Sequence, residues 1–269
     1  MADIETIRRD VAALLDENER ITMNLFEMIL AGKEPFCLSD HESFILCQSN
    51  ERTPLWLWCR ENMAQSAVET AAGALAERLA LNPRLNVDAI PGRSDEILRL
   101  AAQKKGLVPQ PVMALNAYVC RAARAPVCRG RMVSPEDAHR PAMASLLRQL
   151  VEDGEHQTLR DEDAQGFAAA MVGSDKLFLW EDESGEICAM AMIAHQTEKT
   201  ARINTVVTDR AKRGHGYAGM LVASLCRELL AHGATPMLYA DADYPASNRA
   251  YQKIGFEKAG EVTQYRFDR

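Results

Sequence analysis

The sequence predicts an α+β protein built from two α/β halves, and three observations support this class. Strand-like and helix-like segments follow one another in a similar order in both halves. Three apolar runs between residues 177 and 208 are spaced as an antiparallel meander. A length of 269 residues suits one large domain or two modest ones.

In the first half, apolar residues recur at helical spacing through residues 2–32. Strands are expected at Phe36–Leu38, Ser43–Gln48, Leu55–Arg60, Asn86–Ile90 and Val112–Cys120. Helices are expected over residues 64–81 and after Ser94, which can cap a helix that ends before Gly106. Residues 121–130 lack periodicity and contain Ala-Pro, so they predict a linker between domains 1–125 and 130–269.

The second half predicts a short strand at Met132–Val133, with Ser134 or Asp137 as the cap of the next helix. Helices are expected near residues 138–153, 161–173, 216–232 and 246–254. Strands are expected at Leu177–Glu181, Ile187–His195, Ala201–Thr208 and Pro236–Ala240, and a last strand or hairpin at Phe256–Phe267. Gly233 marks the end of the third of these helices.

The order of elements suggests an internal repeat. Helix 64–81 corresponds to helix 216–232, and strand 112–120 to the C-terminal strand. Coincidental α/β alternation is the alternative. The turn before helix 64–81 contains no glycine, so the first copy lacks the loop described next.

Composition excludes several function classes. The net charge of −7 and pI near 5.5 disfavour binding to nucleic acid as a main function. The chain shows neither a secretory leader nor an apolar run of membrane-spanning length, which predicts a cytoplasmic protein with no membrane partner. Seven scattered cysteines without a Cys-x-x-Cys pair predict reduced, mostly buried thiols and no metal site.

The most informative segment is Arg213-Gly214-His215-Gly216-Tyr217-Ala218-Gly219, between an apolar strand and a long helix. Glycines at the start of a helix let backbone N–H groups approach an anion, and the helix dipole adds partial positive charge. Phosphate is the usual ligand of such a turn.

The same letters fit a dinucleotide-binding fold, since Gly214, Gly216 and Gly219 satisfy G-x-G-x-x-G and Asp241 follows at the end of a strand. That reading fails on three counts. Six residues separate strand and first glycine, the preceding strands form an antiparallel meander, and too few residues follow Asp241 to complete a doubly wound sheet.

Two blocks together resemble the GNAT superfamily of acyl-CoA-dependent N-acetyltransferases. Arg213-Gly-His-Gly216-Tyr-Ala218 fits its Gln/Arg-x-x-Gly-x-Gly/Ala pattern, and Asn248-Arg-Ala-Tyr251-Gln-Lys-Ile-Gly255-Phe256 is similar to its second block. The wording is most similar to the glycine-N-acyltransferase-like branch. The resemblance covers residues 130–269 and implies a mixed, largely antiparallel central sheet flanked by helices, with residues 1–125 as a degenerate, related domain.

The resemblance also implies the site. The coenzyme A diphosphate would be bound by the backbone of the loop, with Arg213 adding charge and Lys212 or Arg210 reaching the 3′-phosphate. The pantetheine arm would lie along the strand at Val206 and Val207, with the Val207 amide polarising the thioester carbonyl. Tyr251 would protonate the leaving thiolate, and Asn248 would bind the pantetheine. The coenzyme-binding set is Val206, Val207, Arg213, Gly214, His215, Gly216, Tyr217, Ala218, Gly219, Asn248 and Tyr251.

The sequence identifies no general base. Asp241, Tyr239, Asn204 and His195 lie on strands that can face an acceptor, but each residue type is more often structural. Trp56 and Trp58 line either a pocket or, more commonly, a core. The carboxylate-rich segments 152–155 and 160–163 indicate helix ends and solvated faces.

We therefore expect an N-acetyltransferase that transfers an acyl group from acetyl-CoA to the primary amine of a small molecule or amino acid, in a ternary complex. A non-catalytic coenzyme A-binding protein and a nicotinamide-dependent oxidoreductase are the alternatives. The sequence leaves monomer and homodimer open.

Overall fold

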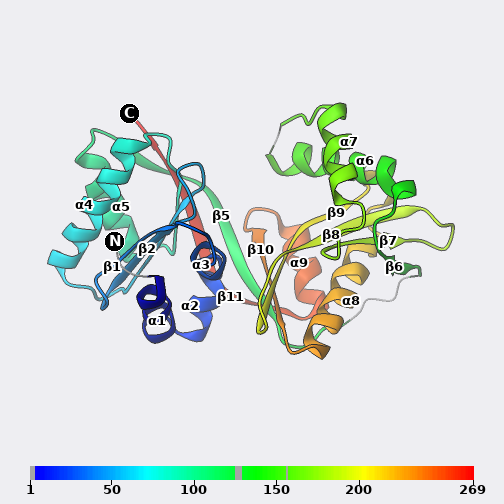
Figure 1. The fold of residues 1–269 in the computed structure, drawn as a ribbon, viewed down its shortest axis with the longest axis horizontal. Helices are drawn as coiled ribbons and strands as arrows, with labels where there is room; N and C mark the ends of the chain where they lie inside the picture. Colours follow the sequence, from blue (N-terminus) through cyan, green and yellow to red (C-terminus); the bar gives the residue numbers. More distant parts are fainter. Residues whose placement is uncertain (1–3, 125–128, 156) are drawn as a thin grey trace. The chain divides into compact units, whose positions relative to one another are not determined.

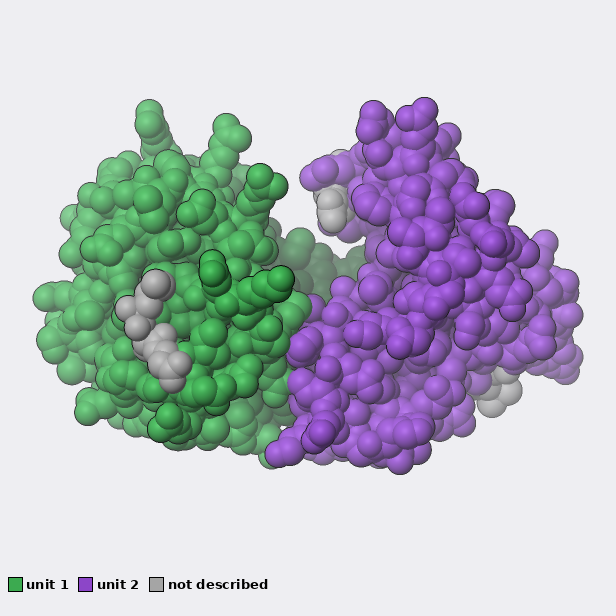
Figure 2. Space-filling view, in the orientation of Figure 1, with its two compact units in different colours: residues 1–118, 239–245, 258–269 green, residues 119–238, 246–257 purple. Residues whose placement is uncertain are grey.

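The computed structural model describes residues 4–124, 129–155 and 157–269, which form two compact units (Figures 1 and 2). Unit 1 comprises residues 1–118, 239–245 and 258–269, and unit 2 comprises residues 119–238 and 246–257. Among the described residues, no helix is both long and apolar enough to cross a bilayer.

Unit 1 is a sheet with helices on both faces. Its strands are β1 (Phe36–Ser39), β2 (Phe44–Gln48), β3 (Leu55–Cys59), β4 (Val87–Ala89), β5 (Val108–Cys120) and β11 (Phe256–Asp268), in the order β1-β2-β3-β4-β11-β5. Its helices are α1 (Ile4–Leu14), α2 (Glu17–Thr22), α3 (Leu25–Leu30), α4 (Gln65–Leu81) and α5 (Arg93–Gln103). Alternating strand residues enter two cores, one against α4 and α5 and the other against α1 and α3.

Two sequence expectations for this unit need correction. The single helix expected over residues 2–32 is three helices, because Asp16 forms a capping box with Glu19 and starts a new helix at Glu17. Ser94 does not cap α5, which begins at Arg93 after Gly92. Its hydroxyl instead donates a hydrogen bond to the Ile90 carbonyl.

The cysteines of the described residues are free thiols, and all but the half-buried Cys59 are buried. Cys128 lies outside the described residues, as does part of the expected linker. Trp56 and Trp58 are buried core residues rather than pocket walls. The Trp58 indole donates to Glu19, and Trp56 packs on Tyr239 with ring centroids 6.0 Å apart.

Unit 2 carries an antiparallel meander that continues into one parallel strand. Its strands lie in the order β10-β9-β8-β7-β6 and are β6 (Arg131–Val133), β7 (Leu177–Glu181), β8 (Ile187–Gln196), β9 (Thr200–Thr208) and the first four residues of β10 (Thr235–Asp241). Helices α6 (Arg140–Glu155) and α7 (Asp161–Met171) pack on one face, and α8 (Tyr217–Ala231) packs on β7, β8 and β9 (Figure 1). Helix α9 (Pro245–Ile254) precedes β11, and the 3₁₀ turns η1 (Asp137–His139) and η2 (Arg210–Lys212) precede α6 and α8. The cap before η1 is Glu136, not Ser134 or Asp137.

The two units repeat one strand-pairing pattern. Strands β2 and β3 are antiparallel, β3 and β4 are parallel, and α4 connects the parallel pair. In the same way, β8 and β9 are antiparallel, β9 and β10 are parallel, and α8 connects them. The correspondence between α4 and α8 expected from the sequence is therefore present in the topology.

The chain does not divide at the linker alone. Residues 239–245 and 258–269, which the sequence places in the second domain, belong to unit 1. Strand β11 pairs with β4, with Thr263 opposite Ala89 and Tyr265 opposite Val87, and Tyr265 and Phe267 enter the core of unit 1. Strand pairing acts between residues far apart in sequence, so the local pattern does not reveal which sheet a terminal strand completes.

Asp88 provides a test of the buried sheet of unit 1. Only 3% of its surface is exposed, and Gln264 donates a hydrogen bond of 3.0 Å to its carboxylate. Burial raises the pKa of Asp88 to about 6. The folded state therefore binds a proton between about pH 4 and pH 6 that the unfolded state releases, and stability falls as pH rises through that window.

We expect Asp88→Asn to stabilise the protein near pH 7.5 by roughly 2–3 kcal/mol, because the amide keeps the acceptor for Gln264 without the buried charge. The gain should disappear near pH 3.5, where the carboxyl is mostly protonated in both the folded and the unfolded state. Thermal or urea unfolding at both pH values measures this. Asp175→Asn, at an exposed position, is the control. A gain that persists unchanged at low pH contradicts the assignment.

Candidate functional site

Strand β9 carries a bulge just before the glycine-rich turn. Met190 pairs with Val207 and Met192 with Asn204, so two steps along β8 match three along β9. Within this stretch Thr205 has φ 54°, a left-handed conformation that is costly for a β-branched residue. A bulge takes one residue out of the hydrogen-bonded ladder and is common next to active sites. The Val207 side chain is buried against Met190 and the α6–α7 core, as expected for a residue of which only the backbone is available.

After β9 the chain makes a short 3₁₀ turn and then enters α8. The Asp209 carboxylate accepts a hydrogen bond of 2.8 Å from the Ala211 N–H and caps this turn. Gly214 and Gly216 follow with φ 83° and 84°, which only glycine adopts readily. A Cβ atom on either glycine would meet nothing within 4 Å. The space in front of the turn is therefore open.

Helix α8 begins without a side-chain cap. Gly216 is its N-cap residue and has no side chain that could accept a hydrogen bond from the first-turn N–H groups. These donors and the positive end of the helix dipole make an anion-binding position. The residues predicted to form it, from Arg213 to Gly219, lie together there. The described part of unit 2 therefore fits a diphosphate at this end of α8.

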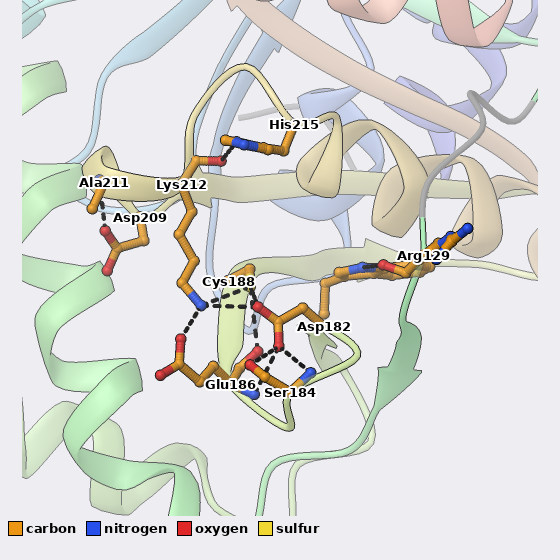
Figure 3. Close-up of polar contacts among 10 residues, drawn as sticks. Arg129, Asp182, Ser184, Glu186, Cys188, Asp209, Ala211, Lys212 and His215 are labelled. Carbon is orange, nitrogen blue, oxygen red and sulfur yellow. Dashed lines mark hydrogen bonds and ion pairs between the residues drawn. The ribbon is translucent and has the colours of Figure 1, made fainter.

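The basic side chains of the turn do not point into this open space. Lys212 extends from the turn to the β7–β8 hairpin, where its Nζ lies 3.0 Å from Asp182 and also contacts Glu186 (Figure 3). Arg210 forms ion pairs with Glu152 and Asp153 of α6, and Arg213 pairs with Asp153. The expectation that Lys212 or Arg210 reaches a 3′-phosphate is not supported, because both cations already bind carboxylates.

These pairs shift the pKa values of their members. Hydrogen bonds from Ser184 and then Lys212 hold the pKa of Asp182 far below its usual range. Hydrogen bonds from Arg210 and Arg213 lower the pKa of Asp153, while Glu186 raises that of Lys212. Asp153, Asp182 and Lys212 are therefore charged at neutral pH.

His215 is exposed, as expected, and its ring has a defined place. Its Nδ1 lies 3.2 Å from the Lys212 carbonyl and 3.1 Å from the Arg213 carbonyl. The ring stacks on Tyr217 with centroids 5.8 Å apart and planes at 14°. Both rings line a depression of about 380 Å³, together with Arg129 and residues 182–184 of the hairpin turn.

Tyr251 and Asn248 lie on α9 and, three residues apart, share one side of it. Asn248 is buried, and the Tyr251 ring meets Phe256 edge to face at 5.8 Å. Burial raises the pKa of Tyr251 to about 12, so the phenol keeps its proton at neutral pH. Together with the loop and the bulge, all of the predicted site residues belong to unit 2.

Residues 141–256 match the model of the acetyltransferase (GNAT) family. This segment is a GNAT domain. It begins in α6 and ends where β11 begins, so it contains the bulged strand, the glycine-rich turn and both residues of α9.

Relatives and solved structures agree with the GNAT domain. The chain is 36% identical over 93 residues to a mycothiol acetyltransferase of Corynebacterium glutamicum, covering 34% of this chain and 31% of that protein. The chain thus spans about a third of the length of this curated relative. A GCN5-related N-acetyltransferase from Kribbella flavida is 12% identical with a TM-score of 0.61, over 93% of this chain and 94% of that one.

A tandem GNAT protein from the clavulanic acid biosynthesis pathway also has a similar structure. It is 13% identical with a TM-score of 0.55, over 97% of this chain and 92% of that one. These matches extend over unit 1 as well as the GNAT domain. They agree in fold with the repeat seen in the strand pairing.

Sequence reasoning missed the acidic partners of the turn. Glu152 and Asp153 lie on the solvated last turn of α6, as expected, but nothing in the sequence indicated that both pair with Arg210. Asp182 and Glu186 carried no signal, because they lie on a hairpin 30 and 26 residues from Lys212. Acidic residues are common in hairpin turns, so their positions give no hint of a partner. Only the folded sheet brings them close to Lys212.

The four residues considered as general bases separate in the structure. The Tyr239 hydroxyl donates to the Thr22 carbonyl at 2.6 Å within unit 1, and Asp241 accepts from the Asp243 N–H. The Asn204 side chain accepts from the Thr205 hydroxyl, and His195 is the next-to-last residue of β8. Tyr239 therefore has a structural role, and none of the four is assigned as a base.

Substitution of three glycines can distinguish the cost of a left-handed backbone from the cost of a steric collision. Gly216 and Gly233, at the two ends of α8, have φ 84° and 81°, and a Cβ on either meets nothing within 4 Å. Gly255 has φ 113°, and its Cβ would lie 2.2 Å from the Ala122 carbonyl oxygen.

We expect Gly216→Ala and Gly233→Ala to cost about 1 kcal/mol each, a loss of about 2–4 °C in Tm. Gly255→Ala should cost at least twice as much, because strain is joined by a backbone collision. Thermal unfolding of the three variants measures this order. Equal losses at all three positions contradict the role given to the Ala122 contact.

Proposed function

We propose that the protein is an acyl-CoA-dependent N-acyltransferase that uses acetyl-CoA and transfers the acetyl group directly to a primary amine in a ternary complex. The observation that carries the proposal is the uncapped, glycine-flanked start of α8 directly after a bulged strand, within a GNAT domain. The acceptor is a small molecule or an amino acid.

The backbone of the turn supplies coenzyme binding. Gly214 and Gly216 leave open space beside the turn, and Gly216 has no capping side chain, so a diphosphate there would gain backbone N–H donors and the helix dipole without displacing a cap. The bulge in β9 suits the pantetheine arm, which adds to Val206 and Val207 through backbone hydrogen bonds. The Val207 amide then lies where it can polarise the thioester carbonyl.

Tyr251 supplies the proton. Attack by the amine breaks the carbon–sulfur bond and releases a thiolate, and a thiol pKa of about 8.5 makes protonation useful near neutral pH. Because burial raises its pKa to about 12, the phenol is fully protonated under these conditions. A phenol with this pKa is a weaker acid than the thiol, so it donates a hydrogen bond to the developing thiolate and passes its proton on only as the attacking nitrogen releases one. Asn248, buried on the same side of α9, orients the arm beside it.

The amine must lose its proton before it attacks, because an alkylammonium with a pKa near 10 is not nucleophilic. The rate should therefore rise with pH until the pH reaches the pKa of the acceptor amine. The curated relative is named a mycothiol acetyltransferase, and it shares about a third of this chain. This partial similarity supports acetyl transfer as the reaction. It does not identify the acceptor, which we expect to be a small amine.

Coenzyme binding tests the first half of the proposal. We expect acetyl-CoA and coenzyme A, but not NAD(H), to raise Tm, since a ligand at 100 times its Kd stabilises by about 2.7 kcal/mol. Gly216→Ala should weaken binding about tenfold or more, because its Cβ enters the diphosphate position. Gly233→Ala, with the same backbone strain at the other end of α8, should bind normally. Stabilisation by NAD(H) alone would favour an oxidoreductase.

Tyr251→Phe tests the second half. We expect kcat for thiol release with a screened amine to fall about 10²-fold or more while the Kd for acetyl-CoA changes little, because only the proton donor is lost. Stopped assays for free thiol and calorimetric titration measure the two quantities. Unchanged turnover removes Tyr251 as the acid, and no turnover with any amine favours a non-catalytic coenzyme A-binding protein.

A further inference from the structure

Three cations flank the diphosphate position in a protein of net charge −7. We propose that Arg210, Lys212 and Arg213 are positioning residues that hold the turn through two carboxylate clamps, so that the coenzyme diphosphate is bound by backbone N–H groups without these side chains. This inference rests on the proposed function. It assigns roles to acidic residues of α6 and of the β7–β8 hairpin.

The first clamp is formed by Gln149, Glu152 and Asp153, which lie on one side of α6 at helical spacing. The Gln149 side chain accepts from the Arg210 backbone N–H at 2.7 Å. Glu152 lies 2.8 Å from the Arg210 guanidinium, and Asp153 binds both Arg210 and Arg213 through different oxygens. Arg213 also donates to the Thr208 carbonyl at 3.2 Å. The start and the end of η2 are thus tied to one helix.

The second clamp joins the middle of the turn to the β7–β8 hairpin. The Lys212 Nζ lies 3.0 Å from Asp182 and contacts Glu186 (Figure 3). Asp182 is itself fixed, because it accepts from the Ser184 hydroxyl at 2.6 Å and from the Ser184 and Glu186 N–H groups. Lys212 is 24% exposed and Asp182 15%, so this pair is shielded from water and salt better than the first clamp.

Clamped cations have two consequences for a diphosphate ligand. The turn is held before the ligand arrives, which lowers the ordering cost of binding. In addition, the carboxylates neutralise the cations, so the ligand gains its donors from the backbone between Gly214 and Gly219. The alternative is that the arginines are stored phosphate ligands: they pair with the carboxylates only in the free protein and rotate to the phosphates when the coenzyme binds. The two cases predict opposite effects when a carboxylate is removed.

Affinity for the coenzyme gives the first test. Asp153→Asn removes the carboxylate that Arg210 and Arg213 share, while Glu152 still binds Arg210. Positioning therefore predicts a Kd for coenzyme A about three- to tenfold weaker, whereas stored phosphate ligands predict tighter binding. Lys212→Met should weaken binding similarly. Asp182→Glu should retain most of the affinity, because it keeps the charge. The KM for acetyl-CoA should rise in parallel while kcat at saturation stays within about twofold.

Comparison with 3′-dephospho-coenzyme A gives the second test. If neither Lys212 nor Arg210 contacts the 3′-phosphate, the ratio of the two Kd values is the same in the wild type, in Lys212→Met and in Arg210→Met. A ratio that approaches one in either variant overturns the inference for that residue. Asp161→Asn, which breaks an α7 ion pair with Arg148, and Lys176→Met, at an exposed position, are the matched controls.

Hydrogen exchange of the free protein tests the clamps without any ligand. Asp153→Asn and Lys212→Met should each increase exchange of the amides from Ala211 to Gly219 while exchange in α9 stays unchanged. Unchanged exchange in the turn, or tighter coenzyme binding by Asp153→Asn, overturns the inference. A wild-type protein that does not bind coenzyme A refutes the proposed function instead, and the exchange data still decide whether the clamps hold the turn.

Discussion

The start of α8 is the feature on which the rest of unit 2 depends. Its N-cap residue is Gly216, which provides no capping side chain, and a Cβ atom on Gly214 or Gly216 would meet nothing within 4 Å. A helix end in this state is stable in water but is better satisfied by an anion. The sheet serves this end of the helix. Strand β9 delivers the chain to it, and the parallel pairing of β9 with β10 requires a connection as long as α8.

Strain is concentrated where the strand meets the turn. Thr205 is a β-branched residue with a left-handed backbone conformation, and it lies within the bulge of β9. Such a conformation persists only when the surrounding structure holds it. Here the neighbouring Val207 is anchored in the α6–α7 core. The bulge and the glycine turn together release backbone donors over a short length of chain, which is what binding along a backbone requires.

The charged side chains near the turn pair with one another and so stabilise the structure of the turn. Arg210, Lys212 and Arg213 each have a carboxylate partner on α6 or the β7–β8 hairpin. The protein has more acidic than basic residues, so such partners are available. In unit 1 the contrast is Asp88, a buried carboxyl that has a hydrogen bond from Gln264 rather than an ion pair. Its sheet is completed by β11, so residues at the end of the chain determine the surroundings of a residue near position 90.

The sequence by itself determined most of the elements and the glycine-rich turn, because both follow from local patterns. The glycines at 214 and 216 need left-handed φ values, and the meander and α8 follow from apolar periodicity. Only the tertiary structure decided that β11 completes unit 1, that Tyr239 is bound to Thr22, and that Lys212 faces Asp182. Each of these contacts joins residues far apart in the chain, and no residue type or spacing encodes such a pairing.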